Sequence, residues 1–207
     1  MSLSLPEQIS QALQIVDAQG VRGRRLLDGS QRLCRLVHRL LGMGLIPVPA
    51  DVEALEPACA ALQLTLREGM SGGERAPMTL KDRVESAGEM LISLVQGEAP
   101  LLDRTVRLLR QVPQRQPTLA EARLLADAVN LEDFGISGVL TMMTSVTLAG
   151  DGVTQLAEAW RTKEQYGYWD ARLARFHFPA VREIARVRLD NARKTMELLG
   201  SELPEAR

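Results

Sequence analysis

Apolar residues recur every three or four positions along almost the whole chain, and this spacing places them on one face of an α-helix. The clearest example follows Pro179, which stands where a proline suits the first turn of a helix. Its apolar stripe consists of Val181, Ala185, Leu189, Ala192, Met196 and Leu199. No segment alternates apolar and polar residues as a half-buried strand does. The sequence therefore predicts an all-α fold, a compact bundle of about eight to ten helices.

Capping residues and helix breakers indicate where these helices begin and end. Two capping boxes are expected, formed by Ser4 with Glu7 and by Thr118 with Glu121, and Thr79 with Asp82 is expected to start another helix. Ser30 is a candidate cap for a helix that ends near residue 41, and helices are also expected over 138–148 and 153–163. Glycine and proline predict a loop at 42–49 and a connector at 70–77.

Length and composition favour a single soluble domain. The chain has 207 residues, of which 45% are hydrophobic and 25% charged, and its net charge is −1, so no overall field attracts a membrane or nucleic acid. Cys34 and Cys59 lie in apolar runs without metal-type spacing, which is typical of buried thiols in a reducing compartment. The first residues lack the pattern of a signal peptide, and the weakly polar run Ile136–Gly150 is too short to cross a bilayer. We expect a cytoplasmic protein with no membrane partner.

The segment Glu121–Gly138, EARLLADAVNLEDFGISG, places the carboxylate of Asp127 at the edge of an apolar helical stripe. It resembles the "L-x-D-A-D-x-L-D-x-x-G" helix of the HD-domain metal-dependent phosphohydrolases, in which the first Asp is a metal ligand. The resemblance implies an HD-like region over about 25–150, with a C-terminal helical extension over about 151–203, in one domain spanning 1–207. In that family an early His, a His-Asp pair and a later Asp hold one or two divalent ions that activate water.

Two further segments resemble the other ligand motifs of the family but lack the ligands. Asp28–Leu33 is similar to "D-H-S-x-R-V" with Gly29 in place of His, and Ala60–Leu66 is similar to "A-A-L-L-H-D-I" with Leu64 and Thr65 in place of the pair. A lone carboxylate does not hold a divalent ion against water. We therefore expect no metal and no cofactor, and Asp127 as a vestigial ligand position, a partly buried carboxylate paired with an Arg or capping a helix.

Six of the seven aromatic residues fall in the segment Trp160–Phe178, where they alternate with cationic side chains. Such a mixture packs a helix onto a core, anchors a protein interface or binds an anionic ligand. We take Asp127, Arg161, Trp169 and Arg172 as the candidate binding residues. A protein partner, a second copy of the chain or a small anionic ligand are the candidate partners.

The preferred function is a catalytically inactive HD-type helical domain that acts as a binding or regulatory module and forms a homodimer. The first alternative is a divergent phosphohydrolase that uses Mn or Mg, with ligands drawn from Asp127, Glu132, Glu68 and His38. The second is a helical nucleic-acid binder that uses six arginines between Arg22 and Arg39. We disfavour nucleic acid because a basic stretch in a near-neutral protein is usually matched by acidic residues elsewhere.

Overall fold

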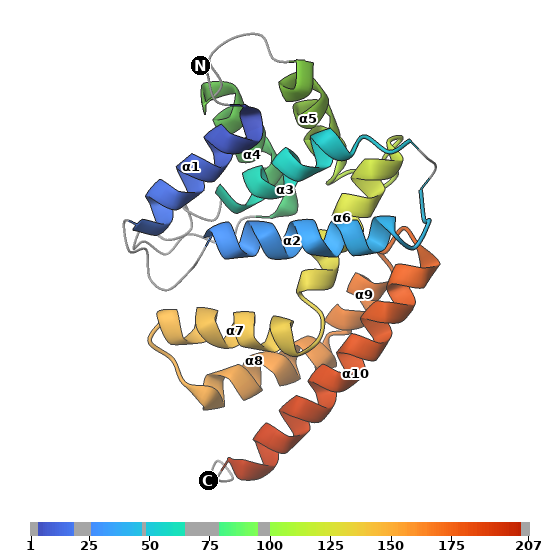
Figure 1. The fold of residues 1–207 in the computed structure, drawn as a ribbon. Helices are drawn as coiled ribbons and strands as arrows, with labels where there is room; N and C mark the ends of the chain where they lie inside the picture. The colour runs from blue at the N-terminus through green and yellow to red at the C-terminus, as the bar shows by residue number, and fades with distance from the viewer. Residues whose placement is uncertain (1–3, 19–25, 47–48, 65–78, 95–99, 204–207) are drawn as a thin grey trace. The chain divides into compact units, whose positions relative to one another are not determined.

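The computed structural model describes residues 4–18, 26–46, 49–64, 79–94 and 100–203. Within these ranges the chain forms ten α-helices and no strand, which confirms the all-α fold. In chain order the helices are α1 (Leu5–Ala18), α2 (Leu26–Leu41), α3 (Val52–Leu64), α4 (Leu80–Leu94), α5 (Pro100–Gln111), α6 (Ala120–Glu132), α7 (Ile136–Leu148), α8 (Val153–Gln165), α9 (Tyr168–Leu173) and α10 (Pro179–Glu202) (Figure 1). No helix in the described part of the chain is both long enough and apolar enough to span a membrane.

The chain divides into two compact units, residues 1–126 and 127–207. The division falls within α6, so the first two turns of this helix belong to the first unit and Asp127 opens the second. The sequence predicts one domain over 1–207 whose C-terminal extension begins at about residue 151, and its apolar spacing continues through α6 and α7 without any signal at residue 126.

The first unit is built around α3, which packs against α1, α2, α4 and α5 (Figure 1). This central position explains the composition of α3, whose residues Ala54, Leu55, Ala58, Cys59, Ala61 and Leu62 are each at most 1% exposed. Around it, α2 and α5 are amphipathic: α2 buries Leu33, Val37 and Leu40 and directs arginines outward. Burial of apolar surface against α3 is the main stabilising contribution to this unit.

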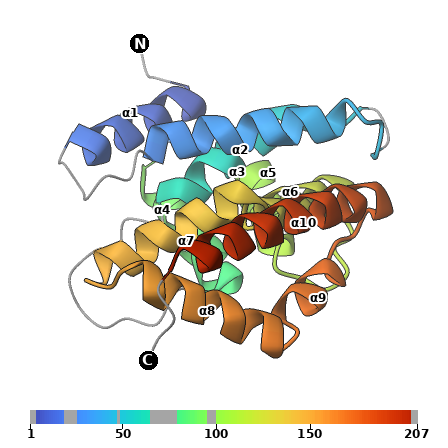
Figure 2. The same cartoon turned by 90° about the horizontal axis from the view of Figure 1, so that it is seen from below.

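In the second unit, α10 packs against α7, α8 and α9 (Figure 2). Five of the six residues of its predicted stripe are buried, and Leu199 is partly exposed. Pro179 occupies the first turn of α10, as expected, because this position needs no backbone N–H donor. The helix α7 begins at Ile136 and α8 extends to Gln165, each two residues beyond the expected limits.

One of the two predicted capping boxes is present, and the helix start expected at Thr79 with Asp82 is confirmed. The backbone N–H and hydroxyl of Ser4 donate to Glu7, and those of Thr79 donate to Asp82. The other predicted capping box, Thr118 with Glu121, is wrong. The N–H and hydroxyl of Thr118 donate to Oε1 of Gln111 instead, while Oε1 of Glu121 accepts from the N–H of Asp51.

The start predicted for α2 at Ser30 is also wrong. The helix already includes Leu26, so Ser30 is a buried residue of its second turn. Several predictions fall outside the described residues. They concern the connector at 70–77, the arginines at 22, 24 and 25, the alternative ligand Glu68, and Thr65, which stands in place of a family ligand.

Candidate functional site

The carboxylate of Asp127 is bound by the backbone at the start of α10. Its Oδ1 accepts a hydrogen bond from the N–H of His177 at 2.8 Å, and its Oδ2 accepts one from the N–H of Phe178 at 3.0 Å. Phe178 is the N-cap of α10, where backbone donors have no partner within the helix. Asp127 is only 1% exposed, so its side chain ties α6 to the entrance of α10.

Burial sets the protonation behaviour of this carboxylate. Removal from water raises the pKa of Asp127 to about 6, and this effect outweighs the two backbone hydrogen bonds and the positive charge of Arg182, which lower the pKa. Arg182 also donates to the carbonyl of Phe176 at 3.0 Å. The structure thus gives Asp127 the role that the sequence offered as an alternative to metal binding, a buried carboxylate at a helix entrance.

Arg172 makes hydrogen bonds on all sides of its guanidinium. Its Nε donates to Oδ1 of Asn130 at 2.6 Å, one Nη donates to the hydroxyl of Tyr168 at 2.8 Å, and the other forms an ion pair with Asp133 at 2.6 Å. Asn130 returns a hydrogen bond to the carbonyl of Arg172. Asp133 is half-exposed, and it anchors Arg172 through this ion pair.

Trp169 lies in an aromatic cluster and is 5% exposed. Its ring meets Phe134 edge-on at 5.5 Å between centroids, and it also contacts Trp160 and Tyr168. Phe134 contacts Phe176 in the same edge-on manner. These contacts fasten α8 and α9 onto the turn that follows α6, because aromatic pairs in this geometry add to the stability gained from burial.

Of the four candidate binding residues, Arg161 is the one whose side chain faces solvent. It lies on the exposed side of α8, and its guanidinium forms no hydrogen bond or ion pair with another residue in the described ranges. Asp127, Trp169 and Arg172 are held by contacts within the second unit. Whether any of the four contacts a ligand stays a prediction.

In the first unit, Gly29 lies on the buried side of α2; it is the residue that the sequence resemblance sets in place of the HD family's early His. A Cβ atom built there would lie 2.7 Å from Oε1 of Gln63, a residue of α3 that is 4% exposed. The carboxamide of Gln63 thus fills the space into which a side chain at residue 29 would extend. Leu64 is the last residue of α3.

Neither Gln63 nor Asn130 was singled out from the sequence. Each matters because of a partner far along the chain, and nothing in the local pattern marks it. His38, one of the alternative ligands, forms a surface pair with Glu56, Nε2 to Oε1 at 3.0 Å with both side chains about half exposed. Among the described residues, no three His, Cys, Asp or Glu side chains gather as metal ligands would.

Two glycines allow the turn between α6 and α7. Gly135 has a φ of +87°, a conformation that other residues rarely adopt, and a Cβ there would lie 3.2 Å from Cβ of Arg188. At Gly138 a Cβ would lie 2.0 Å from the carbonyl oxygen of Asp133. The backbone geometry of this turn therefore requires glycine at both positions. Asp133, which directly precedes the turn, contacts Arg172.

No protein-family model matches the chain, and no curated protein matches it. Solved structures do resemble it. The crystal structure of Bacillus subtilis YpgQ in complex with ADP matches with a TM-score of 0.61 and 16% identity, over 97% of this chain and 96% of that one. The selenomethionine form of YpgQ matches with a TM-score of 0.63 and 18% identity, over 98% of both chains. At this level of identity the likeness establishes that the chain has the all-helical fold of YpgQ.

Proposed function

We propose that this chain is a catalytically inactive HD-type helical domain that acts as a binding or regulatory module. The observation that carries the proposal is the set of contacts that the carboxylate of Asp127 makes. Both of its oxygens accept hydrogen bonds from the backbone of the segment before α10, and the side chain is buried. A metal ion bound there would have to displace these donors and to find its remaining ligands elsewhere.

The contact between Gly29 and Gln63 supports the same proposal independently. In the family that the sequence resembles, the corresponding position on α2 carries an imidazole. Here α2 carries no side chain at residue 29, and an amide from α3 fills the space. An amide oxygen and a lone carboxylate are poor substitutes for the imidazoles that bind catalytic transition metals.

The binding part of the proposal starts from the fold. YpgQ, which shares this fold, has been crystallised with ADP. A nucleotide is therefore the first small anionic ligand to test, and we propose that this chain binds such a ligand without hydrolysing it. Self-association of the chain is part of the proposal as well, and light scattering of the purified protein tests it.

Two assays on one preparation test this proposal. The first measures hydrolysis of bis(p-nitrophenyl) phosphate with added Mn²⁺, and the second measures binding of ADP by calorimetry with and without Mn²⁺. We expect no hydrolysis above the buffer rate and ADP binding that does not require the metal. The proposal would be overturned if the unsubstituted protein hydrolysed the substrate with Mn²⁺ and the folded Asp127→Asn variant did not. That result would favour a divergent phosphohydrolase. Absence of ADP binding would refute the nucleotide as its ligand.

A further inference from the structure

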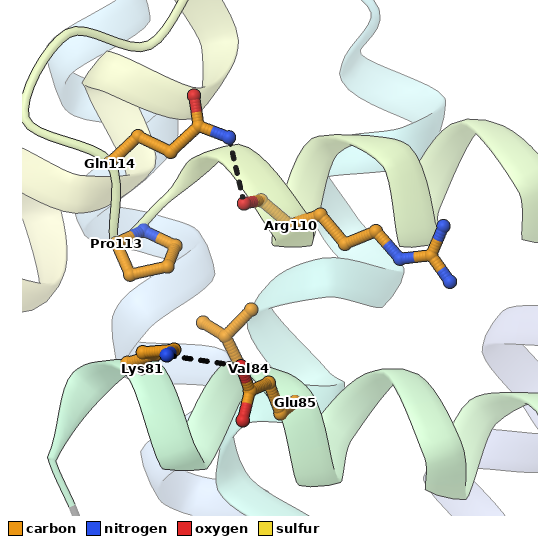
Figure 3. A pocket seen from close by; sticks show the side chains of 6 residues that line it. All are labelled: Lys81, Val84, Glu85, Arg110, Pro113 and Gln114. Atoms are coloured by element: carbon orange, nitrogen blue, oxygen red, sulfur yellow. Dashed lines mark hydrogen bonds and ion pairs between the residues drawn. The ribbon is translucent and has the colours of Figure 1, made fainter.

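A pocket of about 250 Å³ lies between α4 and α5 in the first unit. In Figure 3, Lys81, Val84 and Glu85 line it from α4, and Arg110, Pro113 and Gln114 line it from the end of α5 and the turn that follows. None of these residues belongs to the positions discussed above. The pocket therefore requires an explanation of its own.

The pocket combines an apolar surface with cationic groups. Val84 is 2% exposed and Pro113 is partly buried, so the pocket offers apolar contact at the junction of the two helices. Lys81 and Arg110 carry positive charges, and Glu85 carries the one negative charge among the lining residues. Apolar walls with a small number of well-placed polar groups are typical of small-molecule sites.

Lys81 and Arg110 differ in whether another side chain already pairs with them. Lys81 forms a loose ion pair with Glu85, Nζ to Oε1 at 3.8 Å, and both side chains are more than 60% exposed. Such exposed pairs are weak. Arg110 forms no side-chain hydrogen bond or ion pair with any residue in the described ranges, and its backbone carbonyl accepts from Nε2 of Gln114 at 3.3 Å. Its guanidinium is thus available to an anionic ligand.

We propose that this pocket binds a small organic anion, with the anionic group at the guanidinium of Arg110 and a compact apolar body against Val84 and Pro113. Lys81 lies on the other side of the pocket (Figure 3) and adds only its positive charge to the field. A guanidinium forms paired hydrogen bonds to carboxylate or phosphate oxygens, and this selects an anion over a neutral ligand. The net positive charge of the lining residues favours the same choice. This proposal does not depend on the loss of metal binding at Asp127.

Phenyl phosphate is the probe, because it joins a phosphate group to a flat apolar body. Its titration into the full chain is followed by amide chemical shifts in ¹H–¹⁵N NMR spectra, with inorganic phosphate in a parallel titration. We expect saturable shifts in α4, at the end of α5 and in the following turn, with weaker binding of inorganic phosphate. Equal affinity for the two probes would refute the apolar part of the site, and shifts that do not saturate by about 10 mM would refute the site.

Three variants locate the binding. Arg110→Gln should weaken phenyl phosphate about tenfold, because a charge-assisted hydrogen bond is lost. Glu85→Gln should strengthen it by about two- to fivefold, because it removes the one negative charge among the lining residues. Arg107→Gln is the matched control: it removes the same charge from the exposed side of the same helix but does not line the pocket. An equal loss in Arg107→Gln and Arg110→Gln, or no gain in Glu85→Gln, would refute the proposed geometry.

Discussion

The side chain of Asp127 accepts a hydrogen bond from the backbone N–H of His177 at 2.8 Å, across fifty residues of sequence. A second bond from Phe178 completes the interaction, so one carboxylate fixes the path of the chain into α10. The acidic residue that the sequence indicates as a vestigial metal ligand thus has a structural use in this protein.

Replacement of Asp127 by Ala should destabilise the protein by about 2 kcal/mol at pH 7, because two backbone N–H groups lose their acceptor. Asp127→Asn should cost less, since its amide oxygen still accepts one of the two bonds. Urea unfolding followed by circular dichroism measures both values. Equal stability of the Ala variant and the unsubstituted protein would show that the contact contributes nothing.

The raised pKa of Asp127 also predicts a pH dependence. The folded state holds this proton more tightly than the unfolded chain, whose carboxyl has a pKa near 3.8. The stability that this proton contributes is fully present below about pH 3.8 and is lost as the pH rises to about 6. The contribution to the free energy of unfolding is at most about 3 kcal/mol, because a tenfold change in proton affinity corresponds to about 1.4 kcal/mol.

Unfolding free energies of the unsubstituted protein and of Asp127→Asn, measured from pH 4 to pH 7, isolate this contribution. The difference between the two should change across the window, with the unsubstituted protein losing stability relative to the variant as the pH rises. Parallel curves would contradict the assignment of the titration to Asp127.

Gly29 and Gln63 should show energetic coupling. A Gly→Ala change inside a helix usually stabilises by about 0.5–1 kcal/mol, but here the new Cβ would press on Oε1 of Gln63. We expect Gly29→Ala to be close to neutral alone and to stabilise by about 1 kcal/mol in a Gln63→Ala background. A double-mutant cycle of unfolding free energies tests this, and strict additivity would mean that the two residues do not compete for space.

Arg172 should be a principal stabilising residue of the second unit. Arg172→Gln should cost about 2 kcal/mol, because its bonds to Asn130, Tyr168 and Asp133 are lost together. Arg172→Lys should restore little, since an ammonium does not reproduce the planar donor arrangement. Arg175→Gln is the control, an exposed arginine just beyond α9. Similar losses at the two positions would point to net charge as the cause, and not to the hydrogen bonds of Arg172.

Features that depend on neighbouring residues could be predicted from the sequence. The stripe of α10, the proline in its first turn and the capping pairs at Ser4 and Thr79 all follow from local periodicity and local hydrogen bonds. The pairing of Thr118 with Glu121 failed for the opposite reason. Gln111 and Asp51 supply better partners, and only the tertiary fold brings them near.

The candidate site shows the same limit. The sequence identified Asp127 as an unusual carboxylate, but the donors that bind it come from a segment fifty residues away. Residue spacing does not encode how backbones pack. It therefore cannot show that Gln63 fills the space beside Gly29, or that Gly138 lies close to the carbonyl of Asp133. The composition of the segment Trp160–Phe178 is compatible with packing and with ligand binding, and in the structure Trp169 packs against other aromatic rings.

Calorimetric titration of the chelator-treated protein with Mn²⁺ tests the central claim most directly, namely that the carboxylate of Asp127 serves the fold and holds no catalytic metal. We predict no saturable heat at about 0.1 mM Mn²⁺, and the same trace for Asp127→Asn. Binding of about one Mn²⁺ per chain that Asp127→Asn removes, while the variant keeps its helical circular dichroism, would contradict the claim.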